Sequence, residues 1–98
     1  MELLTERTEQ QLKVAIVGRL DTTTAPELDA MLKDSLDGVQ ELVLDCAKMD
    51  YISSAGLRVL LTTQKRMSKQ GSMKLTGVQE AVMDVFEITG FSGFLEIE

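Results

Sequence analysis

Two kinds of apolar spacing follow one another along this chain of 98 residues. Alternating or continuous short apolar runs predict strands at residues 1–9, 12–18, 42–44, 73–76 and 94–97. Apolar residues three and four positions apart predict helices at residues 25–36, 55–70 and 78–89. Tyr51 and Ile52 are expected to form an extended pair or a short turn. This order predicts an α/β fold in a single small domain, residues 1–98, with helices packed on a mixed sheet of four or five strands.

The most distinctive segment runs from Leu42 to Leu61. A strand ends at Asp45, a short loop follows, and Ser53 and Ser54 stand immediately before a helix. A serine there often accepts a hydrogen bond from a free helix N–H group. The same position would also suit a phosphate, which adds about −1.5 to −2 charge and is stabilised by the positive end of the helix. The two interpretations are compatible, since one serine can cap a helix and be modified.

An aspartate and a glycine near these serines each allow two interpretations. Asp21, Asp45 and Asp50 stand at strand or loop ends and are expected near Ser54 on one edge of the sheet. Asp21 is expected either to cap the following helix region or to belong to a docking surface beside Ser54. Gly56 is costly inside a helix, so it serves either close packing at the first turn or access to the helix N-terminus.

Charge and composition narrow the classes of partner. The net charge is −6, without a cluster of Lys or Arg, which excludes nucleic acid and an anionic membrane surface as expected partners and favours a basic or neutral protein. Histidine is absent and Cys46 is the only cysteine, so we expect no disulfide, no metal site and no cofactor. No signal peptide or apolar run of about 20 residues is visible, and a cytoplasmic location is therefore expected.

Catalytic motifs are missing from the sequence. The G-x-S-x-G pattern fails at Ser54 because position 52 is Ile, and a Ser–His pair is impossible. Neither a Walker A loop nor G-x-G-x-x-G occurs, so nucleotide binding is conceivable but unsupported. The aspartate chemistry of receiver domains needs two acids after the first strand, and only Asp21 is available. We therefore expect a protein that is not an enzyme.

The segment Met49–Leu60, with the sequence MDYISSAGLRVL, resembles the signature of the STAS domain in bacterial anti-sigma factor antagonists. Gly18-Arg19-Leu20-Asp21 followed by Thr24-Ala25 is similar to the other recurring loop of that family. The resemblance covers nearly the whole chain. It implies partner switching, in which the antagonist binds an anti-sigma factor that is also a serine kinase and thereby releases the sigma factor. The kinase then phosphorylates a serine, the complex dissociates, and a phosphatase resets the switch.

By this resemblance the phosphorylated serine is Ser54, with Ser53 as the alternative. The best-known members carry Asp before the serine and Ser or Thr after it, where this chain has Ser53 and Ala55. The residues expected to bind the partner lie in the two motifs: Gly18, Arg19, Asp21, Thr22, Thr23, Asp50, Ser53, Ala55, Gly56 and Arg58. The alternative function is a STAS scaffold subunit that does not switch, in a lipid-transport ATPase or a stress-sensor assembly.

Overall fold

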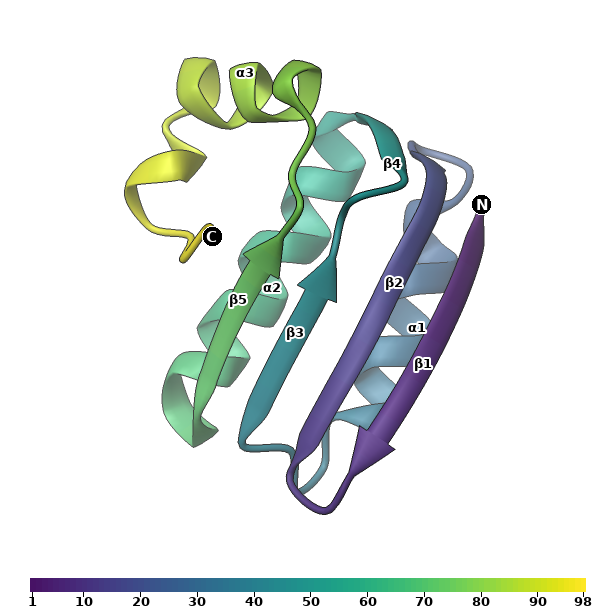
Figure 1. The fold of residues 1–98 in the computed structure, drawn as a ribbon, viewed down its shortest axis with the longest axis vertical. Helices are drawn as coiled ribbons and strands as arrows, with labels where there is room; N and C mark the ends of the chain where they lie inside the picture. Colours follow the sequence, from purple (N-terminus) through teal and green to yellow (C-terminus); the bar gives the residue numbers. More distant parts are fainter.

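A mixed sheet of five strands forms the centre of the computed structural model, which describes residues 1–98 (Figure 1). The strands are β1 (Glu2–Thr8), β2 (Gln11–Leu20), β3 (Glu41–Asp45), β4 (Met49–Ile52) and β5 (Ser72–Thr76). The main order is β1-β2-β3-β5, in which only β1 runs antiparallel to its neighbour. The small α/β fold and its mixed sheet are as predicted, and the extended pair at residues 51–52 proves to be part of β4.

Strand β2 is longer than the sequence indicates, and its predicted end at Gly18 is wrong. β2 pairs with β3 through Ala15 and then with β4 from Gly18 to Leu20. The pairing register shifts between Gly18 and Arg19, and Gly18 has a φ of +101°, a conformation that glycine adopts without strain. This bulge lets one strand change partners along its length.

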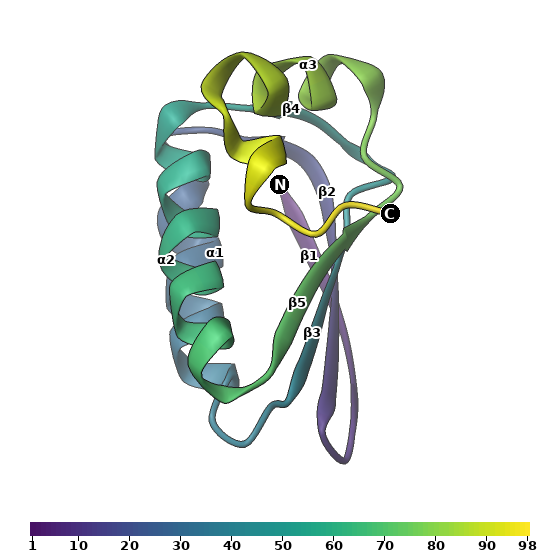
Figure 2. The same ribbon diagram turned by 90° about the vertical axis from the view of Figure 1, so that its left-hand side faces the viewer.

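Helices α1 (Ala25–Ser35) and α2 (Ser54–Gln70) lie side by side on one face of the sheet, as Figure 2 shows. Helix α3 (Glu80–Thr89) crosses the end of the sheet at which the parallel strands finish, and it contacts β4. Gly90, with a φ of +82°, ends α3 as predicted. No helix has the length and apolar character needed to cross a membrane.

The predicted strand at residues 94–97 is wrong. The chain turns through a short 3₁₀ helix, η1 (Phe91–Gly93), because the carbonyl of Phe91 accepts hydrogen bonds from the N–H groups of both Phe94 and Leu95. Only an isolated bridge then joins Ile97 to Leu75 of β5. Leu95 is buried in the core, so its apolar character reflects packing rather than strand pairing.

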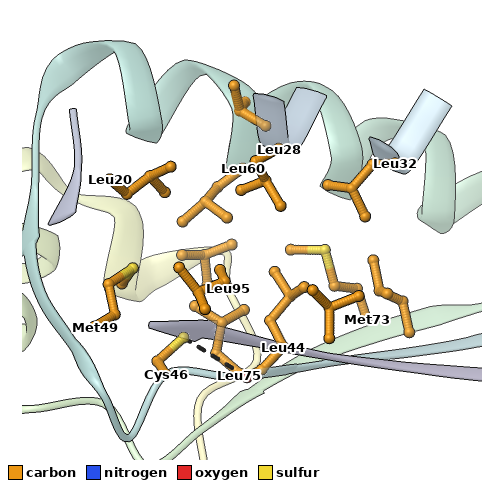
Figure 3. Packing of buried hydrophobic residues seen from close by; sticks show 14 of the residues in the cluster. Leu20, Leu28, Leu32, Leu44, Cys46, Met49, Leu60, Met73, Leu75 and Leu95 are labelled. Carbon is orange, nitrogen blue, oxygen red and sulfur yellow. Dashed lines mark hydrogen bonds between the residues drawn. The ribbon is translucent and has the colours of Figure 1, made fainter. Parts of the chain in front are cut away.

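The hydrophobic core fills the space between the two helices and the sheet (Figure 3). Leu28 and Leu60 point from α1 and α2 toward Leu44 and Leu75 on the strands, and all four are buried. Leu20, at the end of β2, is also fully buried near the start of α2. The core therefore fixes the N-terminus of α2 relative to the loop that follows β2.

Candidate functional site

Helix α2 begins at Ser54, one residue earlier than predicted, and Ser53 is its N-cap residue. No side chain caps this helix, so the expected serine cap is not formed. The hydroxyl oxygen of Ser53 is buried and has no hydrogen-bond partner, whereas Ser54 is exposed. The first turn contains no acidic residue. An exposed hydroxyl therefore stands at the positive end of a helix whose first N–H groups have no side-chain acceptor.

Backbone contacts hold this helix start against the end of β2. The N–H of Ser53 donates to the carbonyl of Leu20 at 2.9 Å. Gly56 is buried, and a Cβ atom there would lie 2.8 Å from carbons of both Ile52 and Leu20. Of the two interpretations of Gly56, close packing is the one that this geometry supports, because no side chain fits between the helix and these neighbours.

The loop after β2 is organised by Asp21. Its Oδ1 accepts hydrogen bonds from the N–H groups of Thr23 and Thr24, both at 3.0 Å. The hydroxyl of Thr24 donates to the carbonyl of Arg19 at 2.7 Å. The N–H of Thr24 contributes most to lowering the pKa of Asp21, and the Thr24 hydroxyl, the Thr23 N–H and Arg19 act in the same direction against partial desolvation. Asp21 thus fixes the turn that leads into α1 and does not cap the helix itself, whose N-cap residue Thr24 forms no side-chain cap hydrogen bond. Its carboxylate is partly exposed and can present a negative charge.

Arg19 connects this loop to β4. Its guanidinium carbon lies 4.0 Å from the centre of the Tyr51 ring, and its Nε lies 3.6 Å from Oδ2 of Asp21. Tyr51 is 40% exposed and is absent from the predicted site residues. It follows Asp50, the unpaired residue at the bulge between β2 and β4. No local pattern marks Tyr51, since its place beside Arg19 depends on the pairing of β2 with β4.

Asp45 lies apart from Asp21, which corrects the expectation that all three aspartates gather near Ser54. Asp45 pairs in register with Ala15 of β2, six residues before Asp21, which directly follows the end of β2. At about 3.3 Å per residue the separation along the strand is about 20 Å. The carboxylate of Asp45 instead accepts a hydrogen bond from the N–H of Ala47 and stabilises the turn after β3.

The remaining predicted residues come together at the adjoining ends of α1 and α2. Thr22, Ala55 and Arg58 line one groove of about 320 Å³ between these helices, beside Pro26 and Asp29. We call the surface formed by residues 18, 19, 21–23, 50, 51, 53–56 and 58 the loop–helix surface. It contains the predicted residues Gly18, Arg19, Asp21, Thr22, Thr23, Asp50, Ser53, Ser54, Ala55, Gly56 and Arg58, with Gly56 buried beneath it.

The STAS domain family model matches residues 2–98. The chain belongs to the STAS domain family. BtrV of Bordetella bronchiseptica, which is named as an anti-sigma factor antagonist, is 38% identical over 93 residues that cover 93% of this chain and 80% of BtrV. The anti-sigma-B factor antagonist of Bacillus subtilis is 31% identical over 93 residues, covering 94% of this chain and 85% of that protein.

Solved structures show the same fold. An anti-sigma factor antagonist from Thermotoga maritima superimposes with a TM-score of 0.90 at 18% identity, covering 97% of this STAS chain and 84% of the other. The Bacillus protein SpoIIAA in its phosphorylated form gives a TM-score of 0.76 at 15% identity, and the match covers 99% of this chain and 91% of SpoIIAA. The arrangement of strands and helices is thus common to chains of very different sequence.

Proposed function

We propose that this STAS domain, residues 1–98, is an anti-sigma factor antagonist that is switched off by phosphorylation of Ser54. In the unphosphorylated state it binds an anti-sigma factor through the loop–helix surface and thereby releases the sigma factor. The anti-sigma factor acts as the serine kinase, and a separate phosphatase restores the active form. The chain itself works in the cytoplasm by binding rather than by catalysis, without a cofactor or metal.

The observation that carries this proposal is the position of the Ser54 hydroxyl. It is exposed at the first position of α2, where a kinase can reach it, whereas the hydroxyl of Ser53 is buried. The uncapped N–H groups of the first turn would also stabilise a phosphate at this end of the helix. The names of BtrV and of the Bacillus subtilis relative favour an anti-sigma factor as the partner.

Electrostatics explains how one phosphate would release the partner. Asp21 belongs to the loop–helix surface, and the hydrogen bonds that lower its pKa favour its charged form. Asp50 is exposed on the same surface. A phosphate adds about −1.5 to −2 charge to these acids, and desolvating unpaired charge at an interface costs several kcal/mol. Each 1.4 kcal/mol changes the affinity about tenfold, so one phosphate is sufficient for an on–off switch.

The test uses the anti-sigma factor encoded in the same genome and compares three variants by isothermal titration calorimetry. Ser54→Asp is expected to weaken binding at least about tenfold, since it places a negative charge at the interface. It should not unfold the protein, because an acid at the start of a helix is favourable. Ser54→Ala should bind like the wild type, and Ser53→Ala serves as the neighbouring control.

Incubation with the same partner and ATP, followed by intact-mass analysis and fragmentation, tests the covalent step. Wild type and Ser53→Ala should gain one phosphate, and Ser54→Ala should gain none. A phosphate on Ser53 would keep the mechanism and move the site. Unchanged affinity of Ser54→Asp together with no phosphorylation would refute the switch, and co-purification with an ATPase would then support the scaffold alternative.

A further inference from the structure

The apolar part of helix α3 is wider than the part that the core buries. Val82 and Phe86, four residues apart, are buried against the rest of the protein. Ala81, Val85 and Ile88 form a second stripe at helical spacing beside the buried one. Val85 is partly buried and packs against the core, whereas Ala81 is exposed and Ile88 is 86% exposed. Exposed apolar side chains that adjoin one another often mark a surface that binds a partner, so the exposed end of this second stripe has the character of a binding surface.

The apolar surface continues beyond α3 into η1, which packs against it. The rings of Phe91 and Phe94 lie 4.7 Å apart, and Phe94 is 42% exposed. Figures 1 and 2 place α3 across the end of the sheet and η1 directly below it, where the chain turns back toward β5. We call the surface formed by Ala81, Val85, Ile88, Phe91 and Phe94 the α3 patch, in which Val85 and Phe91 are partly buried against the core.

All charged side chains in the C-terminal part of the chain, which includes α3 and η1, are acidic. Residues 75–98 contain no Lys or Arg, although they contain Glu80, Asp84, Glu87, Glu96 and Glu98. Glu98 is paired with Lys74 at 3.1 Å. Asp84 lies one helical turn before Ile88, and Glu87 is its direct neighbour, so exposed carboxylates stand beside the apolar stripe. The α3 patch therefore combines an apolar centre with a negative border.

We propose that the α3 patch is a second docking site, which binds an amphipathic helix of a partner protein that carries Lys or Arg beside its apolar face. Charge complementarity selects this occupant. A second copy of the chain that used the same patch would bring carboxylates against carboxylates, and an anionic membrane would also be repelled. From Ala81 to Ile88 the stripe is about 10 Å long, which suits a helix of two to three turns.

The test measures binding of a labelled peptide to the full chain by fluorescence anisotropy. The peptide has about 18 residues, or roughly five helical turns, with Leu on one face of the helix and Lys on the other. A second peptide carries Glu in place of every Lys. The basic peptide is expected to bind about tenfold or more tightly than the acidic one. Ile88→Ser should weaken binding of the basic peptide about tenfold, because it removes the most exposed apolar side chain without changing the charge.

Leu4→Ser is the matched control, since Leu4 is 52% exposed but lies on β1. It should leave the affinity unchanged, as should Ser54→Asp, which separates this proposal from the phosphorylation switch. Both apolar substitutions are at exposed positions, and thermal unfolding of each variant checks that it is folded. Equal affinity of wild type and Ile88→Ser would overturn the proposal. A dimer of the wild type that Ile88→Ser dissociates in sedimentation would also overturn it and identify a second copy as the occupant.

Discussion

Replacing Gly56 by Ala tests the close contact that positions the start of α2. The new Cβ atom would lie 2.8 Å from Cγ1 of Ile52 and 2.8 Å from Cγ of Leu20. Both distances are shorter than carbon atoms tolerate. Leu20 is fully buried and Ile52 nearly so, in a closely packed core. The helix or its neighbours must therefore move.

Two opposing contributions set the size of the effect. Exchanging Gly for Ala inside a helix stabilises it by about 0.5–1 kcal/mol. Overpacking a filled core destabilises the protein by about 1–3 kcal/mol. The net result is a loss of about 1–2 kcal/mol in the free energy of unfolding. In a domain of this size the loss corresponds to a decrease in Tm of about 5–15 °C.

Urea unfolding followed by circular dichroism measures this loss directly. Gly93→Ala is the matched control, because no atom lies within 4 Å of a Cβ atom at that position. Its stability should stay within about 0.5 kcal/mol of the wild type. If Gly56→Ala were as stable as the wild type or more so, the close approach of α2 to Leu20 and Ile52 would be refuted.

Three further predictions concern residues that stabilise the fold around the site. Gln70→Ala should destabilise the fold by about 1–2 kcal/mol in urea unfolding, because Nε2 of Gln70 donates to the carbonyls of Leu36 and Val39, both at 2.7 Å. Asp21 has a folded-state pKa below its usual 3.8, so it contributes stability at higher pH that is lost as the pH falls through the folded-state pKa. Asp21→Asn should therefore be less stable than the wild type above pH 3.8, with a difference that shrinks in acid, as urea midpoints at several pH values would show. Burial, with a smaller contribution from Asp45, raises the pKa of the Cys46 thiol to about 12. The native protein should therefore react with dithionitrobenzoate at neutral pH only as fast as it unfolds, and rapid reaction would contradict this burial.

Local patterns were sufficient for the elements with strong periodicity. Alternation predicted the strand pair at residues 1–9 and 12–18, although β2 continues to Leu20, and apolar residues at helical spacing predicted α1 and α2. Where the pattern was short, it failed. The apolar residues at 94–97 suggested a strand, but Leu95 is buried in the core and Phe94 packs against Phe91. A run of four residues is too short for its apolar spacing to distinguish a paired strand from an irregular segment that packs on the core.

The candidate site, like the fold, could be predicted from the sequence only in part. The pair Ser53-Ser54 before a helix was visible in the sequence, and so was the loop of Arg19 and Asp21. Which serine is exposed was not visible, because burial of the Ser53 hydroxyl depends on how α2 sits against Leu20. Tyr51 was missed for a related reason, since its contact with Arg19 exists only when β4 pairs with β2.

The sequence by itself determined the types of the principal elements and their order, because helix and strand periodicity, glycine stops and the serines before α2 act over a few residues. Only the tertiary structure decided that β2 passes from β3 to β4 at Gly18. That exchange carries Arg19 onto Tyr51 and joins Leu20 to Ser53, which creates the loop–helix surface. The physical reason is that the pairing of strands far apart in the sequence depends on the hydrophobic core that they bury together. No single segment contains the information about that common core.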